Sequence, residues 1–205
     1  MINNTFAILA VLLLNGVLIE EVMLQGRSEL YAENELIENL QACFYAGGFF
    51  CALWGLLHVQ RFERWLGAAF SLACLTFFLR EVDMAELNLP EVVKFFTGGT
   101  SKDLLLAFAF LALIVRFGVT YRQHLREFWT IVRTRIALFC IGGGALLVLG
   151  SLFEQTHHPF LEELVELDGA LLILSAAILY ALSPHRLLGQ SDHPDLDDSR
   201  LVPSS

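Results

Sequence analysis

The sequence predicts an all-α polytopic membrane protein, a bundle of six transmembrane helices with both chain termini in the cytoplasm. The first observation is composition, because 56% of the 205 residues are hydrophobic and only 17% are charged, whereas soluble domains carry about 25% charged residues. The second is a set of six apolar segments of membrane-spanning length. The third is the one-sided distribution of arginine and lysine between them. Since backbone groups in hydrocarbon must be satisfied within the protein, we expect these segments to be helices.

The six segments follow one another along most of the chain, and each reaches the ~20 residues that a helix needs to cross a bilayer. They cover residues 5–24, 38–59, 65–85, 100–119, 136–155 and 163–183. Pro90 and the Gly98-Gly99 pair interrupt the chain between the third and fourth segments, where residues 89–96 are expected to form a short interfacial helix. The first segment lacks the basic start and the cleavage site of a secretory signal, so we expect it to be retained.

The predicted membrane domain covers residues 1–189 and leaves a polar tail, residues 190–205. Rich in Asp, Ser and Pro, this tail is expected to be disordered. Its end, from Leu201, is typical either of a native tail or of an appended protease-site linker.

Basic residues predict the orientation of the bundle. Nine of the 13 lysines and arginines fall near or beyond the ends of the second, fourth and sixth segments, and they are Arg61, Arg64, Arg116, Arg122, Arg126, Arg133, Arg135, Arg186 and Arg200. The positive-inside rule assigns these regions to the cytoplasm. The prediction is therefore a multi-pass protein of the cell inner membrane with cytoplasmic N- and C-termini.

Acidic residues gather on the opposite, extracytoplasmic side, and the chain has a net charge of −9. This charge opposes binding to nucleic acid, which is not expected as a partner. Glu35 and Glu38 lie three residues apart, as do Glu163 and Glu166, so each pair lies on one helix face. Such carboxylates could converge on a hard cation, which prefers oxygen ligands. The alternative is a solvated acidic rim at helix N-termini, where the helix dipole favours glutamate.

A second polar group lies at the end of the third segment. Only fifteen uncharged residues separate Arg64 from Arg80, and as a helix they cover only ~22 Å. Arg80, Glu81 and Asp83 are therefore expected within the outer part of the membrane, where an arginine needs a carboxylate partner. The group is either a structural ion pair or a charge that clamps an anion or tunes the carboxylates. Gln41, one turn from Glu38, is expected to line the same cavity or to make an interhelical hydrogen bond.

Candidate metal ligands lie just before the sixth segment. His157 and His158 could supply nitrogen ligands and Glu162 an oxygen ligand to a divalent metal ion such as zinc. The four cysteines lie inside apolar runs without metal-type spacing, so we expect buried free thiols.

The leading functional prediction is a cavity that binds a cation or protons for transport or conduction. Arg80 would tune the charge of the ion-binding carboxylates, which are Glu38, Glu81, Asp83, Glu163 and Glu166. One alternative is a metal-dependent membrane enzyme that acts on a lipid or lipid-linked substrate. Another is a non-catalytic subunit or assembly partner of a membrane complex. The expected partners are membrane lipids and either further copies of the chain or another membrane protein.

The sequence contains no H-E-x-x-H, G-x-S-x-G, P-loop or G-x-G-x-x-G motif, so it indicates no reaction class. The cytoplasmic halves of the predicted helices also lack polar residues that match the outer cluster. This absence favours the closed cavity of an enzyme or receptor over a channel.

Overall fold

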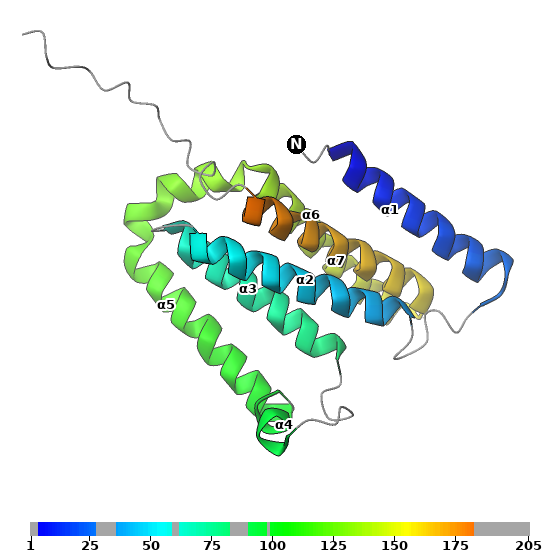
Figure 1. Ribbon diagram of the computed structural model, residues 1–205, viewed down its shortest axis with the longest axis horizontal. Coiled ribbons are helices and arrows are strands. Elements are labelled where there is room, and N and C mark those ends of the chain that lie inside the picture. The colour runs from blue at the N-terminus through cyan, green and yellow to red at the C-terminus, as the bar shows by residue number, and fades with distance from the viewer. Residues whose placement is uncertain (1–3, 28–35, 59–61, 83–89, 98, 183–205) are drawn as a thin grey trace, which may run out of the picture.

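The computed structural model describes residues 4–27, 36–58, 62–82, 90–97 and 99–182, and it is helical throughout these ranges except at short turns (Figure 1). The all-α prediction is confirmed for this part of the chain. The elements are α1 (Asn4–Ile19), the π-helix η1 (Glu20–Leu24), α2 (Leu36–His58), α3 (Phe62–Glu81), α4 (Glu91–Thr97), α5 (Gly99–Val132), α6 (Arg135–Gln155) and α7 (Pro159–Leu182).

Three of these helices, α2, α6 and α7, are long and apolar enough to cross a membrane. The α-helical part of α1 has 16 residues, and the 20 residues of α3 include charged groups at both ends. Membrane association is therefore supported, whereas the count of six spans and the orientation of the termini stay predictions.

The break between the third and fourth predicted segments is confirmed. A short helix, α4, starts directly after Pro90, and Gly99 begins α5 with a φ of +52°. A side chain is rarely tolerated at that φ, which accounts for glycine at this position. The next helix continues to Val132, well beyond the predicted span of 100–119.

Four helices, α2, α3, α6 and α7, form the packed core of the molecule. Figure 1 shows them side by side, with α5 along one edge and α1 set apart from the others. The central buried residues are Tyr45, Cys74, Leu147, Ala170 and Ile173. Their position between the four helices closes the interior of the bundle with apolar side chains.

Close contact between α6 and α7 depends on glycine. A Cβ atom at Gly143 would lie 2.9 Å from the carbonyl oxygen of Gly169, and one at Gly169 would lie 3.0 Å from that of Gly143. Small residues are the usual means by which membrane helices approach so closely. This contact joins the middle parts of the two helices.

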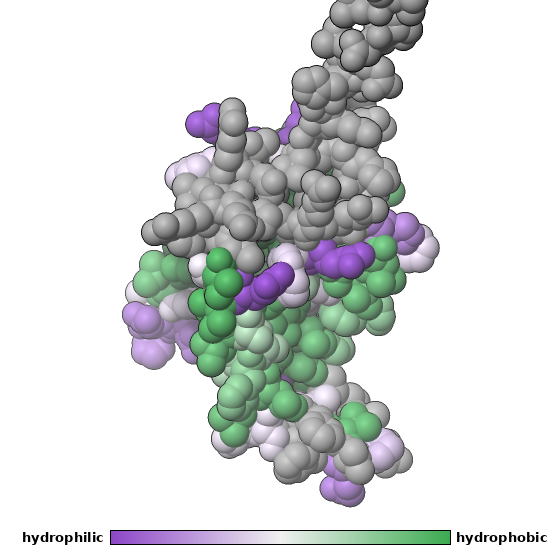
Figure 2. Space-filling view, turned by 90° about the vertical axis from the view of Figure 1, so that its left-hand side faces the viewer, coloured by the Kyte–Doolittle hydropathy of each residue, from purple (hydrophilic) through white to green (hydrophobic). Residues whose placement is uncertain are grey.

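Much of the outer surface is apolar. Exposed side chains include Phe108, Ile114 and Val115 on α5, and Leu138 and Val148 on α6. Figure 2 shows hydrophobic residues covering a broad area of one face, with hydrophilic residues in separate patches. Such a surface fits contact with lipid acyl chains.

Candidate functional site

A cavity of about 370 Å³ opens at one end of the four-helix core, where α2 and α7 begin and α3 and α6 end. Its walls are dominated by carboxylates. The lining residues are Glu38, Arg80, Glu81, Ser151, Glu154, Glu162, Glu163 and Glu166. The structure therefore brings together five of the seven residues predicted to bind a cation or substrate, and the candidate metal ligand Glu162 lies with them.

Helix geometry explains why these side chains meet. Glu162 and Glu166 lie one turn apart on α7, and Glu163 lies beside them on the same side of the helix. The first turns of α2 and α7 carry the positive end of the helix dipole, which favours glutamate there. Arg80 occupies the last turn of α3, where the dipole favours a cation.

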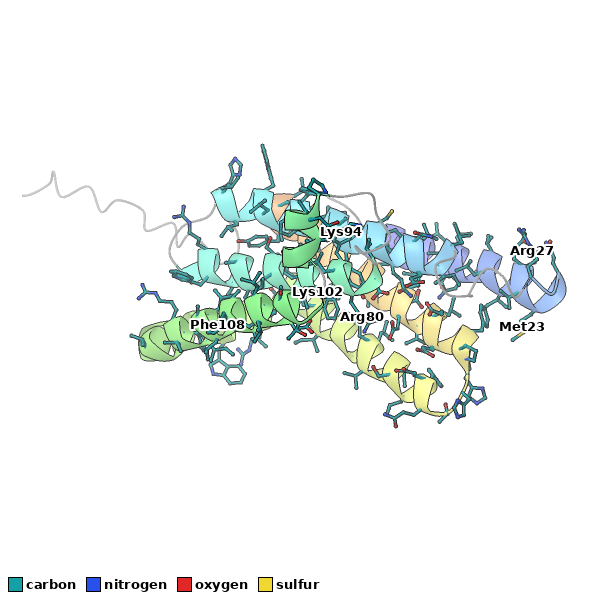
Figure 3. The ribbon with its side chains drawn as sticks, turned by 90° about the horizontal axis from the view of Figure 1, so that it is seen from below. Met23, Arg27, Arg80, Lys94, Lys102 and Phe108 are labelled. Atoms are coloured by element: carbon teal, nitrogen blue, oxygen red, sulfur yellow. The ribbon has the colours of Figure 1, made fainter. Side chains whose placement is uncertain are left out.

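Arg80 is shared between two carboxylates. Its Nε donates to Glu81 Oε1 at 2.9 Å, and its Nη2 donates to Glu166 Oε2 at 2.6 Å. The side chains of Glu81 and Glu166 are only 8% and 9% exposed, whereas that of Arg80 is 50% exposed. In Figure 3, Arg80 lies among the helices, far from Arg27 at the tip of the segment after α1. The predicted ion pair is present, and it links α3 to α7.

Glycine again makes room for the site. A Cβ atom at Gly150 of α6 would lie 2.5 Å from Glu166 Cγ. Any larger residue would displace the glutamate from the position in which it pairs with Arg80.

Gln41 of α2 contacts Glu163, one of the residues that line the cavity. Its buried side-chain amide donates to Glu163 Oε2 at 3.0 Å and to the Glu163 carbonyl oxygen at 3.2 Å. Gln41 does not line the cavity, so its contribution is an interhelical hydrogen bond that orients Glu163. Of the two alternatives that the sequence suggested for Gln41, the structure therefore shows the interhelical hydrogen bond and not the cavity lining.

The two candidate histidine ligands lie at the turn between α6 and α7, and both are exposed. His157 has a φ of +58° and donates its backbone N–H to Glu154 O, while the N–H of His158 bonds to Phe153 O. This is the Schellman arrangement that ends a helix. Neither side chain lines the cavity. Among the residues that the structure describes, no group of three or more His, Cys, Asp or Glu side chains is placed to hold a metal ion.

Asp83, the remaining predicted cation-binding residue, lies outside the described residues.

Of the cysteines, Cys74 is buried, Cys51 and Cys140 are partly buried, and Cys43 is exposed at the surface; all four are free thiols. The prediction that all are buried is wrong for Cys43, because its side of α2 faces outward from the bundle.

The structure adds residues that the sequence reasoning did not select. Ser151 and Glu154 of α6 line the cavity, and their three-residue spacing near the outer end of a predicted helix was an available signal. Tyr45 lies buried in the core, and its hydroxyl group has no hydrogen-bond partner within the described ranges. Asn15 Nδ2 donates to Asp168 Oδ2 at 2.8 Å, which joins α1 to α7. Neither of the last two features follows from spacing along one helix.

Comparison with protein-family models, with curated proteins and with solved structures finds no match to this chain.

Proposed function

We propose that this chain is an integral membrane protein whose acidic cavity binds a cation or protons in the service of transport or conduction. The observation that carries the proposal is the lining of the cavity, in which six glutamates surround one arginine.

The charge balance of the cavity favours uptake of positive charge. The Arg80 guanidinium is already engaged by Glu81 and Glu166. The other lining carboxylates belong to Glu38, Glu154, Glu162 and Glu163. Carboxylates held close together repel one another, and a proton or a cation relieves that repulsion. Oxygen ligands of this type suit hard cations.

The size of the cavity bears on the form of the cation. About 370 Å³ far exceeds the ~10–15 Å³ that a cavity needs to hold one water molecule. The described carboxylates are also not clustered closely enough to enclose a bare metal ion. These two features favour a hydrated cation or protons over a dehydrated metal ion.

The predicted topology places the mouth of the cavity on the extracytoplasmic side. Beyond the cavity the core is closed by apolar residues and by the Gly143–Gly169 contact. Transport by this chain would therefore require the core helices to move, so that the site opens to one side of the membrane at a time. The metal-dependent enzyme has less support, because His157 and His158 lie outside the cavity.

A flux assay in proteoliposomes tests the proposal. The test variant is Glu154→Gln/Glu163→Gln, which removes two cavity charges and leaves the Arg80 pairs in place. The matched control is Glu91→Gln/Asp103→Asn, which removes two exposed charges from α4 and α5. We expect cation or proton flux in the wild type and the control and a strong loss in the test variant. Absence of flux from the wild type would contradict transport, as would equal flux in all three proteins.

A further inference from the structure

The Asn15–Asp168 pair lies on the interface between α1 and α7, apart from the acidic cavity. Next to it, Leu18 of α1 is buried in a cluster with Ile37, Leu164 and Leu167. Other apolar side chains of α1, including Leu12, are exposed. The attachment of α1 to the bundle therefore depends on a small apolar cluster and one polar pair.

In this pair, acceptor oxygens outnumber the hydrogen-bond donors. Asn15 Nδ2 donates to Asp168 Oδ2 at 2.8 Å, but Asn15 Oδ1 and Asp168 Oδ1 are both buried and have no hydrogen-bond partner among the described residues. Both of these oxygens are acceptors when Asp168 is ionised, so neither can satisfy the other. A buried acceptor without a donor is costly, and a buried unpaired charge is more costly still.

No charged group compensates Asp168 in the described part of the chain. The elements packed most closely against α7 are α6, α2 and α1, and Arg80 of α3 also reaches α7, where it pairs with Glu166. Their acidic groups are Glu154 on α6 and Glu38 on α2, with Glu20 and Glu21 in η1 after α1; on α7 itself they are Glu162, Glu163 and Glu166. The basic groups of α2 and α6, His58 and Arg135, lie at the ends of those helices far from the cavity. None of these groups forms an ion pair or hydrogen bond with Asp168.

We propose that Asp168 is a proton-binding site: its neutral carboxylic acid closes a reciprocal pair with Asn15 and holds α1 on α7. The acid proton on Asp168 Oδ1 is donated to Asn15 Oδ1, while Asn15 Nδ2 donates to Asp168 Oδ2. Two hydrogen bonds then satisfy both orphaned oxygens without any further group. Loss of this proton to solvent leaves a buried carboxylate facing the amide oxygen, which weakens the attachment of α1.

Infrared spectroscopy of the detergent-purified full chain tests the protonation state. The difference spectrum between wild type and Asp168→Asn, recorded at neutral pH, is expected to contain the C=O stretching band of a protonated carboxylic acid. The control, Glu163→Gln, changes a cavity carboxyl group and should leave the Asp168 band in place. A difference spectrum that contains only carboxylate bands would overturn the proposal.

Spin-label distances test the attachment of α1. Labels at the exposed positions Leu12 and Leu161, in a background with the four native cysteines replaced, report the separation of α1 and α7. We expect a single short distance while the acid band is present and a longer, broader distribution at higher pH once that band is lost. Asp168→Asn can still donate to Asn15 and should keep the short distance at every pH. An unchanged wild-type distance after the band disappears would overturn the attachment role.

Discussion

Glu166 and Asp168 lie two residues apart on α7, and the surroundings of their carboxyl groups differ. The Glu166 carboxylate receives a charged donor, Arg80, at 2.6 Å. From the part of the chain that the structure describes, the Asp168 carboxyl group receives only the neutral amide of Asn15, at 2.8 Å. Residues two positions apart do not share a helix face, so the two groups meet different neighbours, Glu166 in the core cavity and Asp168 beneath α1.

The comparison shows two ways of holding a carboxyl group within a largely apolar bundle. One is to retain the charge and supply a partner of opposite charge, which leaves the group able to respond to other ions in the cavity. The other is to supply a neutral partner, which favours the protonated acid. The acidic cavity and the α1 attachment are therefore expected to respond differently to substitution.

The largest expected effect is that of Arg80→Ala. This change leaves Glu81 and Glu166 without their shared cation. Loss of one partner of a fully buried ion pair costs about 3–5 kcal/mol, and because the Arg80 side chain is 50% exposed we expect a smaller cost, about 2–3 kcal/mol. Unfolding of the purified protein by heat or denaturant measures the change. The control is Arg27→Ala, which breaks the exposed Arg27–Glu21 pair of 2.9 Å and should cost less than about 1 kcal/mol. Similar losses in the two variants would show that the cavity pair is no more important than a surface pair.

A smaller effect is expected when each α7 carboxyl group is replaced by its amide. Glu166→Gln weakens a charged hydrogen bond to Arg80 and should cost about 1–2 kcal/mol. Asp168→Asn keeps a neutral donor toward Asn15 and should change the free energy of unfolding by less than about 0.5 kcal/mol. The same unfolding assay compares them at neutral pH. A larger loss for Asp168→Asn than for Glu166→Gln would contradict a charged partner at Glu166 and a neutral partner at Asp168.

Sequence patterns predicted the parts of this site that depend on one helix at a time. The three-residue spacing of Glu163 and Glu166 placed them on one face, and the short uncharged run before Arg80 placed that residue near the carboxylates. The helical class and the break at Gly99 followed from composition and from local backbone preference.

Features that depend on contacts between helices could not be predicted in this way. Asn15 and Asp168 are far apart in sequence, and neither residue type identifies its partner. His157 was a candidate metal ligand because of its residue type and its position before the sixth segment. In the structure it lies in the turn that follows α6, and its side chain is exposed. The number of membrane spans depends on how α1, α3 and α5 contact lipid, which charge distribution along the sequence predicts only indirectly.

The most direct test of the acidic cavity is the dependence of thermal stability on cation concentration in detergent-purified protein. A ligand that binds only the folded state adds about 2.7 kcal/mol at 100 times its dissociation constant. We expect an added cation, or a lowered pH if protons are the ligand, to stabilise the wild type and Glu91→Gln/Asp103→Asn. Glu154→Gln/Glu163→Gln should lose most of this response. Equal stabilisation of all three proteins would show general charge screening and would contradict a cation site in the cavity.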